Sequence, residues 1–117
     1  AFGHPQPAQV NISDQALNLL RLELLEEELG ELWSALKAGD VVETADALGD
    51  IEYVLNGAWK AFGLAEYKRP VMEEIHRSNM SKLGEDGKPI YREDGKVLKG
   101  PNYSPPNIAK LLEVSND

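Results

Sequence analysis

The feature that most constrains the fold is the very short junction Gly39-Asp40 between two long helix-forming stretches. Ser13 or Asp14 can cap the first stretch, which runs to about residue 38 and is stopped by Gly39. Asp40 can cap the second, which runs to about residue 62. Because so short a junction leaves no room for any other arrangement, the two helices are predicted to lie antiparallel, as a helical hairpin.

The rest of the chain predicts shorter elements. A third helix is expected over 65–82, with Pro70 either kinking it or lying in its first turn. The dipeptide Asp94-Gly95 favours the tight turn of a small β-hairpin between 88–93 and 96–99. Pro105-Pro106 is expected to open a last short helix that runs to about residue 112.

These elements predict one all-α domain over residues 1–117, with an N-terminal loop (1–12), a helical core (13–82) and a C-terminal tail (84–117) that holds the hairpin or loop. The helical hairpin is expected to form a four-helix-bundle-like core that oligomerisation completes, because 117 residues bury only a modest core. The chain opens at Ala1 rather than Met, so an N-terminal segment can be missing.

Composition excludes some classes of protein. A net charge of -8 repels nucleic-acid backbones, so no nucleic-acid partner is expected. No apolar run approaches the roughly 20 residues that span a bilayer, so no membrane partner is expected either. The absence of cysteine suits a reducing cytosol, and the chain is predicted to be cytoplasmic.

Acidic residues fall on the predicted apolar faces of both long helices. At about 100° per residue, Glu28 and Glu31 share the sector of the leucines and alanines of the first helix, while Glu27 lies at its edge. Arg21 projects near the same stripe. In the second helix, Glu43, Asp46 and Asp50 follow i, i+3, i+7 spacing and share one face. If these acids simply faced solvent, their positions should not follow the apolar stripe on both helices.

Several carboxylates in one helix–helix interface are costly unless a cation neutralises them or some are protonated. A metal ion is the simpler account. Oxygen ligands without cysteine select a hard ion, Mg²⁺ or alternatively Mn²⁺.

The motif Glu27-Glu28-Leu29-Gly30-Glu31 resembles the EExxE half of the signature of the MazG-like, all-α nucleoside triphosphate pyrophosphohydrolase superfamily. The ExxD half can be read as Glu43-Thr44-Ala45-Asp46, or by aligning Asp50 with the family aspartate, which places Ala47 where a Glu is expected. The stretches 76–82, 86–88 and 99–103 are similar to the tail of a phosphoribosyl-ATP-pyrophosphohydrolase-like branch. The resemblance covers about residues 20 to 106.

The resemblance implies helical hairpins assembled as a homodimer or homotetramer, and hydrolysis of a (d)NTP to the monophosphate and pyrophosphate. The expected role is house-cleaning of the nucleotide pool. The acids expected to bind the metal are Glu28, Glu31, Glu43, Asp46 and Asp50, with Glu27 as the base that orients or deprotonates water. Substrate binding is expected of Arg77, Asn79, Lys82, Lys99, Tyr103 and Tyr53. For Tyr53 a place in the core, and for Arg77 a solvated surface charge, are equally open.

Three rival functions remain open. The same chemistry could act on phosphoribosyl-ATP. A carboxylate-bridged metal bundle for redox or metal storage usually places Glu-x-x-His motifs on two facing helices, and the sequence has one such motif, at 73–76, without a second to face it. The third rival is a non-catalytic helical oligomer in which the acids bind a structural ion.

Overall fold

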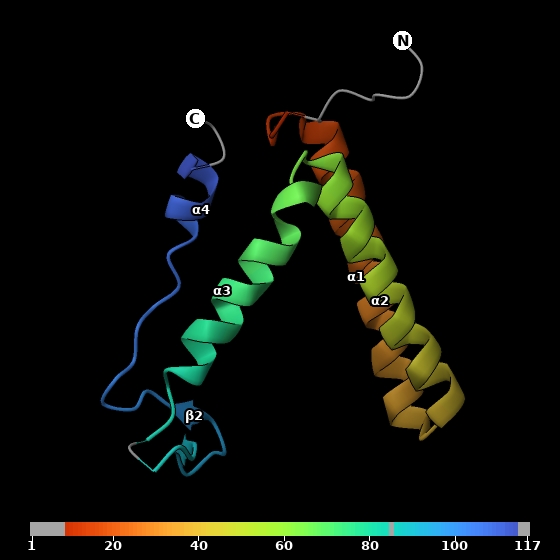
Figure 1. Ribbon diagram of the computed structural model, residues 1–117. Coiled ribbons are helices and arrows are strands. Elements are labelled where there is room, and N and C mark those ends of the chain that lie inside the picture. Colours follow the sequence, from red (N-terminus) through yellow and green to blue (C-terminus); the bar gives the residue numbers. More distant parts are fainter. Residues whose placement is uncertain (1–8, 85, 115–117) are drawn as a thin grey trace. The chain divides into compact units, whose positions relative to one another are not determined.

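The computed structural model describes residues 9–84 and 86–114, and it is mostly helical (Figure 1). The prediction of an all-α fold with a small hairpin is confirmed. The chain divides into two compact units, Ala1–Glu66 and Tyr67–Asp117. None of the helices in the described ranges is long and apolar enough to cross a membrane.

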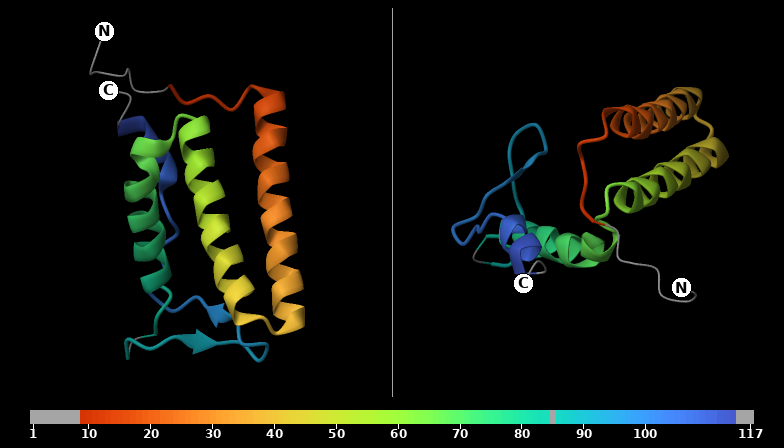
Figure 2. Two further views of the ribbon diagram at one scale, coloured as in Figure 1. Left: turned by 90° about the vertical axis from the view of Figure 1, so that its right-hand side faces the viewer. Right: turned by 90° about the horizontal axis from the view of Figure 1, so that it is seen from above.

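The first unit is the predicted helical hairpin, made of α1 (Gln15–Ala38) and α2 (Val41–Ala61). The side chain of Asp14 caps α1 by accepting from Leu17 N at 3.1 Å. Gly39 ends α1 in the left-handed region, with φ of 68°, and Asp40 then caps α2. The two helices therefore run side by side in opposite directions (Figure 2).

The contact between α1 and α2 is built on small side chains. Ala35 and Ala47 are the buried residues of the two helices, with 6% and 2% of their surface exposed. Leu24, Leu32 and Val54 are only half-buried. Of the acids on the same faces of the two helices, Glu28 and Asp50 are half-buried, and the others, Glu31, Glu43 and Asp46, are exposed.

The end of the hairpin away from the Gly39 turn is closed by the segment that precedes α1. Asn11 N donates to Phe62 O at 3.0 Å, just beyond the end of α2. Gly63 adopts a φ of 72°, and a β-carbon there would collide with the carbonyl of Gln9. Glycine is therefore required at this crossing.

A 3-10 turn, Ala65–Tyr67, crosses from the first unit into the second, and α3 (Lys68–Met80) follows it. The prediction of a third helical stretch from about 65 to 82 is confirmed, although its first three residues form the 3-10 turn and the α-helix ends at Met80. Pro70 lies in the first turn of α3, where its missing N–H costs no intrahelical hydrogen bond, so the helix is not kinked there. At the other end, the hydroxyl of Ser81 donates to Ser78 O at 2.6 Å and helps to end the helix.

The tail contains the predicted hairpin and the predicted last helix, both with different bounds. The strands β1 (Ile90–Tyr91) and β2 (Val97–Leu98) pair antiparallel but are only two residues each, with Gly95 in the turn at φ 86°. The last helix, α4 (Ile108–Val114), begins after the two prolines rather than at them. The helix begins where Asn107 can cap it, because the Oδ1 of Asn107 accepts from Lys110 N at 3.2 Å.

Candidate active site

Three of the predicted metal ligands meet across the helical hairpin. Glu28 and Glu31 of α1 and Asp50 of α2 each present a carboxylate oxygen, and these three oxygens all lie within 4.8 Å of one another. Glu28 and Glu31 are three residues apart and therefore neighbours on one helix face. Asp50 reaches them from the antiparallel partner helix.

The carboxyl of Glu28 lies among other negative charges and is half-buried. Burial raises the pKa of Glu28, and a hydrogen bond to Glu31 together with the negative charges of Glu31, Asp50 and Glu27 raises it further. Its Oε2 is buried and has no hydrogen-bond partner among the described residues. A buried carboxylate oxygen without a partner is costly, and a cation at this position would satisfy it.

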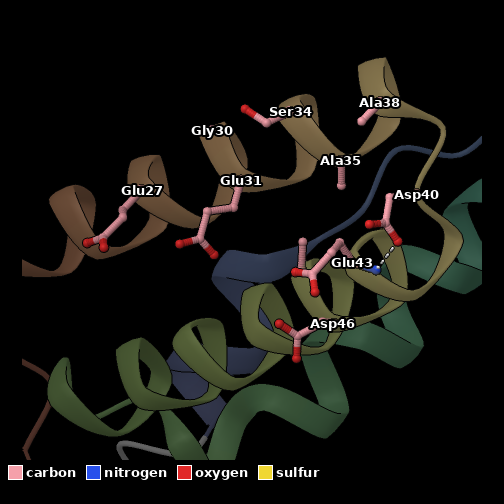
Figure 3. A pocket seen from close by; sticks show the side chains of 10 residues that line it. Glu27, Gly30, Glu31, Ser34, Ala35, Ala38, Asp40, Glu43 and Asp46 are labelled. Carbon is pink, nitrogen blue, oxygen red and sulfur yellow. Dashed lines mark hydrogen bonds between the residues drawn. The ribbon is translucent and has the colours of Figure 1, made fainter.

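The other predicted acids line a groove beside this cluster. The groove has a volume of about 820 Å³ and is bordered by Glu27 and Glu31 of α1 and by Glu43 and Asp46 of α2. Figure 3 shows the side chain of Glu31 reaching from α1 toward α2, from which Glu43 and Asp46 project. Glu31 thus belongs both to the three-carboxylate cluster and to the groove.

Small residues make room for this groove. Its remaining lining consists of the short side chains or bare backbone of Gly30, Ser34, Ala35, Ala38 and Ala47, together with Asp40. Asp40 is occupied with the cap of α2, because its Oδ1 accepts from Glu43 N at 3.0 Å (Figure 3). The hairpin therefore brings together all six acids that were expected to bind metal or activate water, in two adjoining groups.

The residues expected to bind substrate lie in different surroundings. Tyr53, on α2, is 81% exposed, so it does not lie in the core of this chain. The five others belong to the second unit. The ammonium group of Lys99 lies over the ring of Tyr103, 4.9 Å from its centroid. Asn79 is exposed and Lys82 is half-buried, and the backbone carbonyl of Lys82 accepts from Gly100 N at 2.8 Å.

Arg77 is held by an ion pair with Glu74 and by a hydrogen bond to the segment that leads into α4. Its Nε donates to Glu74 Oε1 at 2.7 Å, and its Nη2 donates to Glu74 Oε2 at 2.9 Å and to Pro105 O at 3.0 Å. Glu74 in turn accepts from Asn107 N at 2.8 Å. The ion pair between Arg77 and Glu74 therefore ties α3 to the segment that leads into α4.

Comparison with known proteins places this hairpin in a family. The sequence model of phosphoribosyl-ATP pyrophosphohydrolase matches residues 1–79, which include α1, α2 and nearly all of α3. The predicted resemblance extends to about residue 106, so its tail, with Lys82, Lys99 and Tyr103, lies beyond the matched range.

A curated relative is similar over most of this chain. It is the uncharacterized protein L479 of Acanthamoeba polyphaga mimivirus, which is 38% identical in an alignment of 87 residues that covers 70% of this chain. The match covers 34% of the viral protein, so the chain spans about a third of that relative's length. With the family match covering more than half of the residues, the chain belongs to the phosphoribosyl-ATP pyrophosphohydrolase family, of the MazG-like all-α superfamily.

Proposed function

We propose that this chain hydrolyses (deoxy)nucleoside triphosphates to the monophosphate and pyrophosphate, in a metal-dependent reaction that removes unwanted nucleotides from the cytoplasmic pool. The observation that carries the proposal is the cluster of Glu28, Glu31 and Asp50, whose oxygens gather from two helices within 4.8 Å. The family match supports a pyrophosphohydrolase of this kind.

The donor set fits a hard divalent cation. It offers carboxylate oxygens alone, and one of them, Glu28 Oε2, is buried without a partner in the described part of the chain. Mg²⁺ prefers such ligands and keeps several waters that phosphate oxygens can replace, and Mn²⁺ can take its place. Glu28, Glu31 and Asp50 would hold one ion, and Glu43 and Asp46, which border the adjoining groove with Glu31, would serve it or a second ion.

The bound ion would neutralise charge on the phosphate oxygens of the reacting group. Glu27 is the proposed base, because it lies one residue before Glu28 and faces the groove rather than the three-carboxylate cluster. A water held by Glu27 would attack the α-phosphorus in line with the α–β bridging oxygen. Its proton would pass to Glu27 as the phosphoanhydride bond breaks and pyrophosphate leaves.

An acidic site also needs positive or neutral donors for its substrate. We assign this role to Arg77, Asn79, Lys82, Lys99, Tyr103 and Tyr53. The exposure of Tyr53 leaves its ring face open for stacking on a base or a sugar. The pair of Lys99 and Tyr103 offers a cation beside an aromatic ring.

Phosphoribosyl-ATP is a second candidate substrate, because the matching family carries its name. The bond that breaks is again the α–β phosphoanhydride, so the same carboxylates would serve. The two proposals differ only in what is attached to the reacting triphosphate.

Pyrophosphate release from a panel of nucleotides tests both. The panel comprises dATP, dCTP, dGTP, dTTP, dUTP, the ribonucleotides and phosphoribosyl-ATP, each with Mg²⁺, with Mn²⁺ and with EDTA. We expect release with either metal and none with EDTA. The Glu28→Gln variant should be inactive, whereas Glu52→Gln, which alters an exposed acid of α2, should act as the wild type. Metal binding without hydrolysis of any member would leave the non-catalytic helical oligomer as the function.

A further inference from the structure

One cation of the first unit lies in the helix–helix contact and takes no part in the proposed reaction. The guanidinium of Arg21, on α1, lies over Gly57 of α2, and a β-carbon at Gly57 would be 2.7 Å from Arg21 Nη1. Arg21 is half-buried. The α1 stripe that carries Glu28 therefore also carries a positive charge directed against α2.

The guanidinium has no anion beside it within the described ranges of the chain. Its Nε is buried and has no hydrogen-bond partner, and no ion pair of the described residues involves Arg21. Asn18, one turn earlier on α1, has a buried Oδ1 that also lacks a partner among the residues that the structure describes, so the two groups do not satisfy each other. Buried donors are nearly always paired, and one that is not indicates an acceptor supplied from elsewhere.

The position of Arg21 relative to the carboxylates follows from the antiparallel register. Arg21 precedes Glu28 by seven residues on α1, and Gly57 follows Asp50 by seven residues on α2. Seven residues are about two turns, or roughly 10 Å along a helix. Arg21 therefore lies on the same face of α1 as Glu28, and Gly57 lies on the same face of α2 as Asp50. The charges that act on Glu28 are those of Glu31, Asp50 and Glu27, so Arg21 is not its counter-ion.

We propose that Arg21 is a further substrate-binding residue, which donates to a phosphate oxygen of the polyphosphate chain while the carboxylates hold the metal at the scissile bond. The proposal rests on the proposed function, because it assumes a phosphate chain at the carboxylates. Arginine suits this role, since its planar fork binds phosphate oxygens with two parallel hydrogen bonds. Gly57 acts as a positioning residue, because a β-carbon there would come within 2.7 Å of Arg21 Nη1 and the guanidinium would have to move.

Two substitutions separate the charge from its position. Arg21→Met keeps the apolar stem and removes the guanidinium. Gly57→Ala keeps the charge but displaces it, and alanine favours the helix over glycine, so the fold should not suffer. Gly49→Ala is the matched control, because it makes the same change on α2 where a β-carbon meets nothing within 4 Å.

Binding of inorganic tripolyphosphate in the presence of Mg²⁺, measured by calorimetry, is the first test. Arg21→Met should weaken binding by roughly 10- to 100-fold, the range expected for a charge-assisted hydrogen bond to phosphate, and Gly57→Ala, which displaces the guanidinium without removing it, should weaken binding by a smaller factor. Gly49→Ala should bind as the wild type, and the affinity for Mg²⁺ alone should be the same in all four proteins. Equal tripolyphosphate affinity in the wild type and in Arg21→Met would overturn the proposal.

Kinetics on the best nucleotide of the panel separates the two proposals. If the wild type hydrolyses a nucleotide and Arg21→Met leaves its KM and kcat unchanged, the assignment of Arg21 is wrong while the proposed function stands. If tripolyphosphate binding depends on Arg21 but no nucleotide is hydrolysed, the phosphate site stands and the hydrolase function is wrong.

Discussion

Glu28 and Asp50 face each other from antiparallel helices with carboxylate oxygens no more than 4.8 Å apart. Two negative charges at this spacing repel, and the repulsion is part of what raises the pKa of Glu28. The hairpin is thus held together by other contacts in spite of this pair. The fold tolerates the repulsion at the place where the proposed chemistry needs a metal.

Mg²⁺ should therefore stabilise the protein. An ion that binds the folded state alone adds about 2.7 kcal/mol at a concentration 100 times its Kd. Thermal unfolding with EDTA and with increasing Mg²⁺ measures the effect, and Tm should rise with the Mg²⁺ concentration. Glu28→Gln should abolish this dependence, whereas Glu26→Gln, on the exposed side of α1, should retain it.

The titration of Glu28 should be visible in the pH dependence of the stability of the metal-free protein. In the unfolded chain this side chain titrates near 4.5, and in the folded chain its pKa is higher. Between these values the folded state holds a proton that the unfolded state has released, so rising pH favours unfolding. In EDTA, stability relative to Glu28→Gln should fall as the pH rises from 4.5 through the raised pKa. A constant difference across that window would show that Glu28 titrates normally.

Asp50 and Asp46 should differ as metal ligands. Asp50 belongs to the three-carboxylate cluster, whereas Asp46 borders the groove beside it. Asp50→Asn should weaken Mg²⁺ binding by at least about 10- to 100-fold, since even residues behind the ligands cost that much in metal sites. Asp46→Asn should have a smaller effect on the first ion. If both variants kept metal-dependent hydrolysis intact, the proposed two-helix site would be wrong.

Glu27 should affect turnover and not metal binding. Loss of a general base typically costs about 10²- to 10⁴-fold in rate. Glu27→Gln should lower kcat by that order while Mg²⁺ affinity, measured by calorimetry, stays close to that of the wild type. Unchanged kcat would remove Glu27 from the reaction, and lost Mg²⁺ affinity would make it a ligand instead.

The sequence predicts best the features that depend on residues close together in the chain. Asp14, Gly39 and Asp40 define the hairpin because helix caps are local chemistry. The shared face of Glu28, Glu31 and Asp50 follows from helical periodicity alone, once the helices are antiparallel. Which acids of α2 form the tight cluster depends on the register between the helices, and this is decided by packing.

Long-range contacts are the part that the sequence does not disclose. The carbonyl of Pro105 that accepts from Arg77 is 28 residues away, and no periodic pattern relates the two. The approach of Arg21 to Gly57 joins residues 36 positions apart in the same way. The strands β1 and β2 are shorter than the sequence suggests, because their exposed side chains provide little packing to extend the pairing.

Glu74 should secure the segment that leads into α4. Arg77 and the backbone N–H of Asn107 lower the pKa of Glu74 to about 2. The unfolded chain binds a proton below about 4.5, so the stabilisation is present above that pH and is lost as the pH falls toward 2. Glu74→Gln should speed hydrogen exchange at the amide of Asn107, measured by NMR. Glu73→Gln is the matched control. The side chains of Glu73 and its partner Arg69 are 69% and 90% exposed, respectively, and ion pairs so exposed contribute little to stability.

An exposed apolar stripe on α1 is the expected contact between subunits of the predicted oligomer. Leu22, Leu29 and Leu36 recur every seven residues, and with Trp33 they form an apolar stripe in which each side chain is between 49% and 63% exposed. Such spacing is typical of a helix that packs against another helix. We expect sedimentation to give a dimer or tetramer for the wild type and a smaller species for the double variant Leu29→Ser, Trp33→Ser. Glu23→Ser, an exposed change elsewhere on α1, should leave the assembly intact, and a monomeric wild type would contradict the predicted oligomer.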